Sequence, residues 1–189
     1  MDYIALDERL KRELSKKRYL HTLGCRDEAV SLAKRWGADE DLASDAALLH
    51  DITKELSPEF QLKLCEKFDI IPNHAEKLSP VLLHGVTAAE VARREYDQPD
   101  EVASAIRYHT TGREGMTLLE KVLFIADFIE PTRTFKHDEL TKYAYEDIDR
   151  AILFGLSWSI KEVVDKGLLL HPDTIEGYNS LLWRKYQTE

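Results

Sequence analysis

Apolar residues recur along most of this chain at the three-to-four-residue spacing of an amphipathic helix. The first such segment, residues 2–16, carries apolar side chains at Ile4, Leu6, Leu10 and Leu14. Alternation of apolar and polar residues, which would indicate β-strands, does not extend over any sizeable run. The pattern therefore predicts an all-α fold of about eight to ten helices.

Glycine, proline and capping residues divide the rest of the chain into further helices. Gly37 is expected to end a helix over 18–36, because glycine readily adopts the left-handed conformation that follows many helices. Ser57 and Pro58 are typical of a helix start, and Pro131 should end the helix that begins near residue 117. The remaining helices are predicted at about 41–54, 57–68, 86–96, 100–109, 144–166 and 171–186.

Several apolar segments contain a histidine or an aspartate where an apolar residue would be expected. His50 and Asp51 directly follow the run AALL, and His109 follows AIRY. Asp127 interrupts the run VLFIADFI, which is apolar on nearly every side and is therefore predicted to be buried. A carboxylate in such surroundings loses its hydration and needs a positive partner. That partner is an arginine, a lysine or a metal ion.

Two further histidines lie in similar surroundings, His21 in RYLHTLG and His84 in SPVLLHGV. A single histidine in an apolar segment is more often a hydrogen-bonded core residue than a ligand, so neither is informative alone. His74 and His137 lie in polar segments, as solvated residues should. The polar residues in apolar surroundings therefore form one ordered set: His21, His50, Asp51, His84, His109 and Asp127.

This ordered set resembles the signature of the HD superfamily of metal-dependent phosphohydrolases, which is a histidine, a His-Asp pair and a later aspartate. Longer segments are similar to the bacterial symmetrical diadenosine tetraphosphate hydrolases. These segments are HTLGCRDEAVSLA, AALLHDITKEL, LLHGVTAAEVA, AIRYHTTGREGMTLLEKVLFIADFIEPTR and LLLHPDTIEGYNSLL. The resemblance implies an HD-domain helical bundle at residues 17–189, preceded by an N-terminal helical extension at residues 1–16.

The resemblance also implies a centre of two transition-metal ions, with iron as the expected metal. Its ligands would be His21, His50, Asp51, His84, His109 and Asp127, with Asp51 bridging the two ions. A set of imidazoles and carboxylates without a thiolate disfavours soft-metal sites and suits iron, while manganese, cobalt and zinc stay open. Asp51, His84 and His109 are the residues expected to be catalytic.

The implied reaction is the symmetrical cleavage of diadenosine tetraphosphate to two ADP. A hydroxide bound by both metal ions would attack one of the inner phosphates, with ADP as the leaving group. The expected ligands are therefore a small dinucleoside polyphosphate or ADP. The residues expected to bind the nucleotide are His21, Lys54, His109, Asp127, Arg133, Thr134 and Ile175.

Composition and charge limit the partners further. A formal net charge of −9 argues against sequence-independent binding to nucleic acid. No apolar run approaches the ~20 residues that a membrane span requires, and the N-terminus lacks the apolar core of a secretory signal. We therefore expect a cytoplasmic protein without a membrane partner. Cys25 and Cys65 are far apart, which disfavours a disulfide or a thiolate zinc site. A homodimer stays open.

Three other functions stay open at this point. A nucleotidase or cyclic-dinucleotide phosphodiesterase would use the same metal ligands with a different pocket. An oxidoreductase would use a related di-iron scaffold to activate oxygen. A non-catalytic module would bind nucleotide without turnover, although the presence of all six ligand positions argues against it.

Overall fold

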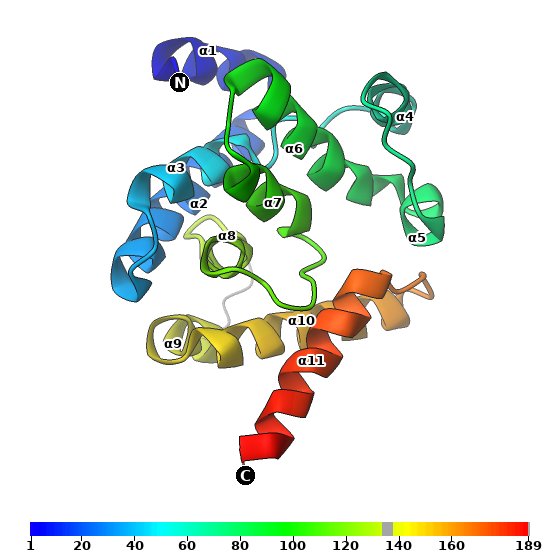
Figure 1. Ribbon diagram of the computed structural model, residues 1–189. Helices are drawn as coiled ribbons and strands as arrows, with labels where there is room; N and C mark the ends of the chain where they lie inside the picture. The colour runs from blue at the N-terminus through cyan, green and yellow to red at the C-terminus, as the bar shows by residue number, and fades with distance from the viewer. Residues whose placement is uncertain (134–137, 189) are drawn as a thin grey trace.

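Helices form all the regular secondary structure in residues 1–133 and 138–188, the part of the chain that the computed structural model describes (Figure 1). The all-α prediction is confirmed. The helices in these ranges are α1 (Tyr3–Glu13), α2 (Lys16–Trp36), α3 (Glu40–Leu49), α4 (Pro58–Lys67), α5 (His74–Leu78), the 3-10 helix η1 (Pro80–Leu82), α6 (Leu83–Tyr96), α7 (Asp100–Tyr108), α8 (Leu118–Ile129), α9 (Asp138–Glu146), α10 (Ile148–Asp165) and α11 (Pro172–Thr188). None of them combines the length and apolarity that a bilayer crossing requires.

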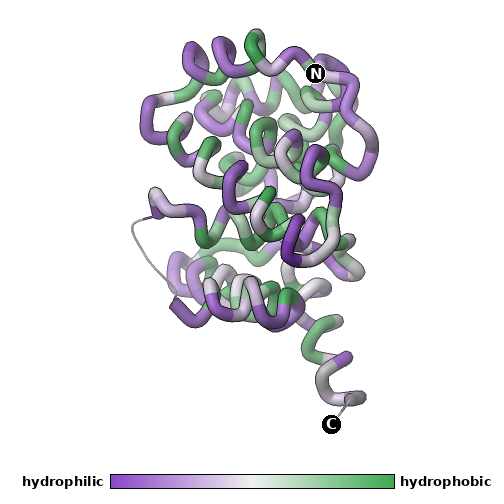
Figure 2. Tube along the Cα trace, turned by 90° about the vertical axis from the view of Figure 1, so that its left-hand side faces the viewer, coloured by the Kyte–Doolittle hydropathy of each residue, from purple (hydrophilic) through white to green (hydrophobic). Residues whose placement is uncertain are grey.

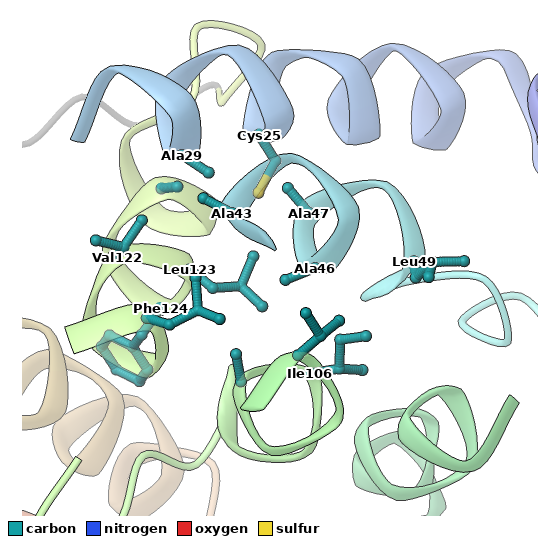
Figure 3. Close-up of a cluster of buried hydrophobic side chains, with 14 of the residues drawn as sticks. Cys25, Ala29, Ala43, Ala46, Ala47, Leu49, Ile106, Val122, Leu123 and Phe124 are labelled. Carbon is teal, nitrogen blue, oxygen red and sulfur yellow. The ribbon is translucent and has the colours of Figure 1, made fainter. Parts of the chain in front are cut away.

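The centre of the core lies between α2, α3, α7 and α8 (Figure 3). Small side chains occupy the contact between α2 and α3, where Cys25 and Ala29 face Ala43 and Ala47. These small residues allow the two helix backbones to approach closely, because little side-chain volume separates them. The position of α3 relative to α2 is therefore fixed by close packing. Helix α2 carries His21, and the end of α3 carries His50 and Asp51.

Phe124 of α8 joins the central helices to the C-terminal layer. Its ring is fully buried, which contributes about 1.5–3 kcal/mol to stability. Gly155 of α10 lies directly against it, and a Cβ atom at this position would be only 2.8 Å from Phe124 Cε1. The lack of a side chain at Gly155 therefore lets α10 pack closely on α8.

Helix α3 ends earlier than its apolar pattern predicts. The predicted helix continues to residue 54, whereas α3 ends at Leu49 and turns follow. His50 Nδ1 donates to the carbonyl of Ala47 at 2.7 Å, and this carbonyl would otherwise accept the amide of residue 51 in a continuing helix. The end of the helix directs His50 and Asp51 into the interior instead of along a helix surface.

Two other differences concern short or divided helices. The segment predicted as one helix over 144–166 contains the end of α9 followed by α10, and the two helices are separated at Asp147. Asp147 has an extended backbone, and its side chain accepts the amide of Arg150 as an N-cap. Helix α5 was not predicted; it begins with a capping box in which Asn73 and Glu76 satisfy each other's amides.

The two ends of the chain differ in their packing. Leu6, Leu10 and Leu14 are buried in the main core, while the division of the chain after residue 16 stays a prediction. Helix α11 instead projects from the body of the molecule toward the C-terminus (Figures 1 and 2). Its first turn is held by Thr174, which donates to the carbonyl of Thr111 at 2.8 Å.

Candidate metal centre

The six polar residues singled out in the sequence meet at one place between α2, α3, α6, α7 and α8. His21 lies on α2, His84 near the start of α6, and Asp127 on α8. His50, Asp51 and His109 directly follow the ends of α3 and α7. All four histidines and Asp51 are buried, and the Asp127 side chain is 13% exposed.

The carboxylate of Asp51 lies at the middle of this cluster, with one oxygen toward each pair of histidines. Its Oδ2 lies 3.2 Å from His50 Nε2 and 3.5 Å from His21 Nε2. Its Oδ1 lies 3.3 Å from His84 Nε2 and 3.9 Å from His109 Nε2. Two groups of possible metal ligands result, and Asp51 belongs to both.

Three of the histidines are oriented by the main chain. Each ring Nδ1 lies against the carbonyl three residues earlier: His50 against Ala47 at 2.7 Å, His84 against Val81 at 2.5 Å, and His109 against Ile106 at 2.6 Å. A carbonyl can only accept, so Nδ1 carries a proton, and in the neutral ring Nε2 carries the lone pair. All three lone pairs therefore face the interior of the cluster.

Two of the ring nitrogens that face the cluster lack the partners that buried nitrogen atoms normally have. Among the described residues, His21 Nε2 and His50 Nε2 have no hydrogen-bond partner, although carboxylate oxygens lie close to both. His84 Nε2 and His109 Nε2 are only 3.0 Å apart, and Lys54 Nζ lies 3.1 Å from His84 Nε2. Buried polar atoms are rarely left unsatisfied, and two lone pairs that face each other favour a cation beside them, which Lys54 supplies for His84 and a metal ion would supply for both rings. The donor set therefore fits bound metal ions.

The surrounding charges keep both carboxylates ionised. Burial alone would raise the pKa of Asp51. Without a metal ion, however, the charge of Asp51 raises the pKa of His50 despite burial, and the positive charge on this ring holds the pKa of Asp51 well below its usual value. Burial likewise opposes ionisation of Asp127, whose pKa is held well below its usual value by His21 and Arg133. Ionised carboxylates are the form that coordinates cations.

Burial has the opposite effect on two of the rings. It lowers the pKa of His109 to about 4, and together with nearby Lys54 it lowers the pKa of His84 well below its usual value. Both rings are therefore neutral near pH 7, as metal binding requires. Lys54 donates through Nζ to His84 Nε2 at 3.1 Å, and burial lowers the pKa of Lys54 itself.

A cleft of about 430 Å³ opens next to His21, with basic side chains along its walls. Arg18 lies one helical turn before His21 on α2, and its Nη1 is 2.7 Å from Asp51 Oδ2. Arg133 forms an ion pair with Asp127 and donates through Nε to the Asp127 carbonyl at 2.8 Å. The cleft is lined by Ser15, Lys17, Arg18, His21, Glu55, Glu130, Thr132 and Arg133.

Only some of the residues predicted to bind the nucleotide lie close to the histidine cluster. Lys54 and Arg133 lie beside the histidine cluster. Ile175 lies outside it, exposed on the first turn of α11, and Thr134 lies outside the described residues. These assignments stay predictions.

Two residues at the site were missed in the sequence. Arg18 precedes His21 by three positions, which places both on one face of a helix. Glu130 accepts from His21 Nδ1 at 2.9 Å, and it lies three residues before Arg133, which was predicted to bind the nucleotide. The helical spacing could have indicated Arg18, whereas nothing in the sequence shows that Glu130 is buried.

Comparison with known proteins gives consistent results. Residues 18–132 match the family described as the HD domain. A Bacillus subtilis protein named symmetrical bis(5'-nucleosyl)-tetraphosphatase is 39% identical over 175 residues, covering 92% of this chain and 94% of the relative. A Staphylococcus aureus protein with the same name is 32% identical, covering 89% of each chain.

A solved structure is similar over nearly the whole length. It is a Clostridium acetobutylicum protein described as a predicted HD superfamily hydrolase involved in NAD metabolism. It superposes with a TM-score of 0.93 at 40% identity and covers 97% of this chain and 98% of its own. The likeness therefore includes the parts of the chain on both sides of the matched domain.

Proposed function

Since the chain belongs to the HD domain family and to the symmetrical bis(5'-nucleosyl)-tetraphosphatases within it, we propose that it cleaves diadenosine tetraphosphate symmetrically to two ADP. Membership makes the chain a metal-dependent phosphohydrolase. The family name supports the substrate, and the position of Asp51, whose two oxygens each face a separate pair of histidines, supports a centre of two metal ions. This arrangement suits two cations close together.

The proposed ligands follow from the two groups. His21, His50, Asp51 and Asp127 would hold one ion, and Asp51, His84 and His109 the other. Iron is the metal we propose, because imidazole and carboxylate donors suit it. When bound, such ions supply an activated water and offset the negative charge of the phosphoryl oxygens. The chain's own residues provide the orientation of the donors and the surroundings of the substrate.

The basic residues of the cleft are proposed to bind the phosphates. A guanidinium has five N–H donors, so Arg18 can contact Asp51 and still present other donors to a phosphate. Arg133 lines the same cleft and pairs with Asp127, which places its positive charge beside the proposed phosphate site. The volume of about 430 Å³ falls within the roughly 300–1,000 Å³ of small-molecule sites. Lys54 would add positive charge beside His84, and Thr134 and Ile175 are proposed as further nucleotide contacts.

The nucleotide products test the proposal directly. Diadenosine tetraphosphate incubated with the metal-loaded protein should yield ADP as the only nucleotide, because attack at an inner phosphate divides the substrate equally. Chromatography of the products checks this. In water enriched in oxygen-18, half of the ADP should carry the label. Equal amounts of AMP and ATP would contradict symmetrical cleavage, and oxygen consumption without hydrolysis would favour an oxidoreductase.

Replacing Arg18 with alanine should weaken substrate binding more than it affects the metal ions. A hydrogen bond to a charged group is worth about 1.5–3 kcal/mol, so the KM and the Kd for ADP should rise about 10-fold to 100-fold. Arg12→Ala is the matched control, since Arg12 is an exposed arginine that pairs with Glu13 and does not line this cleft. Unchanged ADP binding together with loss of metal would mean that Arg18 serves only as the counter-ion of Asp51.

A further inference from the structure

Glu130, which directly follows α8, places a buried carboxylate behind the His21 ring. Its side chain is 0% exposed. One oxygen lies 2.9 Å from His21 Nδ1 and accepts the hydroxyl of Thr132 at 2.7 Å, and the other accepts the amide of Thr132 at 2.7 Å. These donors compensate for the hydration that the carboxylate loses. Glu130 is thus held in place by its own turn and directed at the ring.

This partner distinguishes His21 from the other three histidines of the cluster. Their Nδ1 atoms lie against neutral main-chain carbonyls, whereas His21 Nδ1 lies against an acidic side chain. A carboxylate partner fixes the tautomer of an imidazole and increases its basicity, and the loss of such a partner commonly costs 10–100-fold in metal affinity. His21 is therefore the ring of the four whose Nδ1 is held by an acidic side chain, so that its strength as a metal ligand depends on Glu130.

Gly24 gives independent support, because it leaves the space that Glu130 occupies. It lies one turn after His21 on α2, and a Cβ atom there would be only 2.6 Å from Glu130 Oε2 and 3.5 Å from Pro131 Cδ. Glycine inside a helix destabilises it by roughly 0.5–1 kcal/mol relative to alanine. Glycine at this position therefore costs the helix some stability, but it leaves room for the Glu130 carboxylate beside His21.

We propose that Glu130 is a positioning residue that sets the tautomer and basicity of His21 and thereby the affinity of one metal ion, with Gly24 making room for it. The proposal rests on the proposed role of His21 as a ligand. It predicts an effect on the ion held by His21 and none on the ion held by His84 and His109.

The test is a titration of the metal-free protein with Co²⁺ alone, followed by visible absorption. Glu130→Gln keeps the volume of the side chain but removes its charge, and it should weaken one of two Co²⁺ ions about 10-fold to 100-fold while leaving the other unchanged. Gly24→Ala should have the same selective effect, because it displaces Glu130 without removing any polar group. Nitrogen-15 NMR of the metal-free protein should find His21 protonated at Nδ1.

Glu120→Gln is the matched control. Glu120 is an equally buried carboxylate on α8, but it is paired with Arg113 and contacts Ser104 and Thr117 instead of the histidines. It should lower the melting temperature without changing either Co²⁺ affinity. Equal loss of affinity in the Glu120 and Glu130 variants would overturn the proposal, because both would then act through stability.

His21→Ala separates this inference from the proposed function. If His21→Ala binds both Co²⁺ ions as tightly as the unchanged protein, then the ligand assignment and the role of Glu130 both fail. If His21→Ala loses one ion while Glu130→Gln and Gly24→Ala keep both affinities, only the positioning role is overturned. Protonation of His21 at Nε2 in the metal-free protein would also overturn it.

Discussion

Replacing Asp51 with alanine should abolish hydrolysis and release both metal ions, the largest effect that we expect from any single substitution. Both groups of possible ligands contain this carboxylate, and its two oxygens face opposite histidine pairs. Without Asp51, the proposed ligands would be four neutral imidazoles and Asp127, so that a single carboxylate would have to offset the charge of two cations. We expect turnover to fall by at least about a thousand-fold.

Elemental analysis of the purified variant should find the metal content reduced from two ions per chain to nearly none. Asp51→Asn should behave similarly, because it keeps the shape but removes the charge. Asp45→Asn is a suitable control, since Asp45 lies on α3 and accepts a hydrogen bond from Tyr3 away from the cluster. Normal turnover by the Asp51 variants would mean that the site has been assigned wrongly.

Replacing Asp127 with alanine should remove only one ion, although the hydrolytic activity should again fall to a low residual level. Asp127 approaches the cluster at one point, where its Oδ1 lies 3.0 Å from His21 Nε2. The second group, formed by Asp51, His84 and His109, does not include it. One bound ion cannot replace a pair that neutralises the same phosphoryl group, so hydrolysis should fail even though half of the metal is kept.

The measurement is again the metal content per chain, taken together with turnover. Arg133→Ala is the informative control, because it removes the ion-pair partner of Asp127 while leaving every proposed ligand in place. It should keep both ions and impair substrate binding. Loss of both ions from Asp127→Ala, or of neither, would show that the two ligand groups are not divided as proposed.

The fold was largely predictable where the pattern is long and regular. The apolar positions of the segments that form α2 and α8 indicated both helices within a few residues. The end of α3 was not predictable in the same way, because it depends on His50 donating to the Ala47 carbonyl. The break at Asp147 and the start at Asn73 both depend on capping hydrogen bonds, which short polar segments show only weakly.

Some residues of the candidate site could be predicted from the sequence, and others could not. His50, Asp51 and Asp127 were conspicuous because a polar residue inside an apolar run needs a special reason to be there. Arg18 and Glu130 were not, since charged residues near helix ends are usually solvated. Arg18 faces the cluster because α2 packs beside Asp51 at the end of α3, which its spacing from His21 could have indicated. Glu130 faces it because the turn after α8 lies against α2, which only the folded structure shows.

The anchoring of three rings by main-chain carbonyls has a consequence for how the protein acquires its metal. These rings are oriented by the ends of helices that the apolar core already stabilises. Chelation should therefore leave a folded protein that regains its ions on simple mixing. Since many divalent ions accept such donors, the metal found in a living cell would reflect supply during growth more than any requirement of folding.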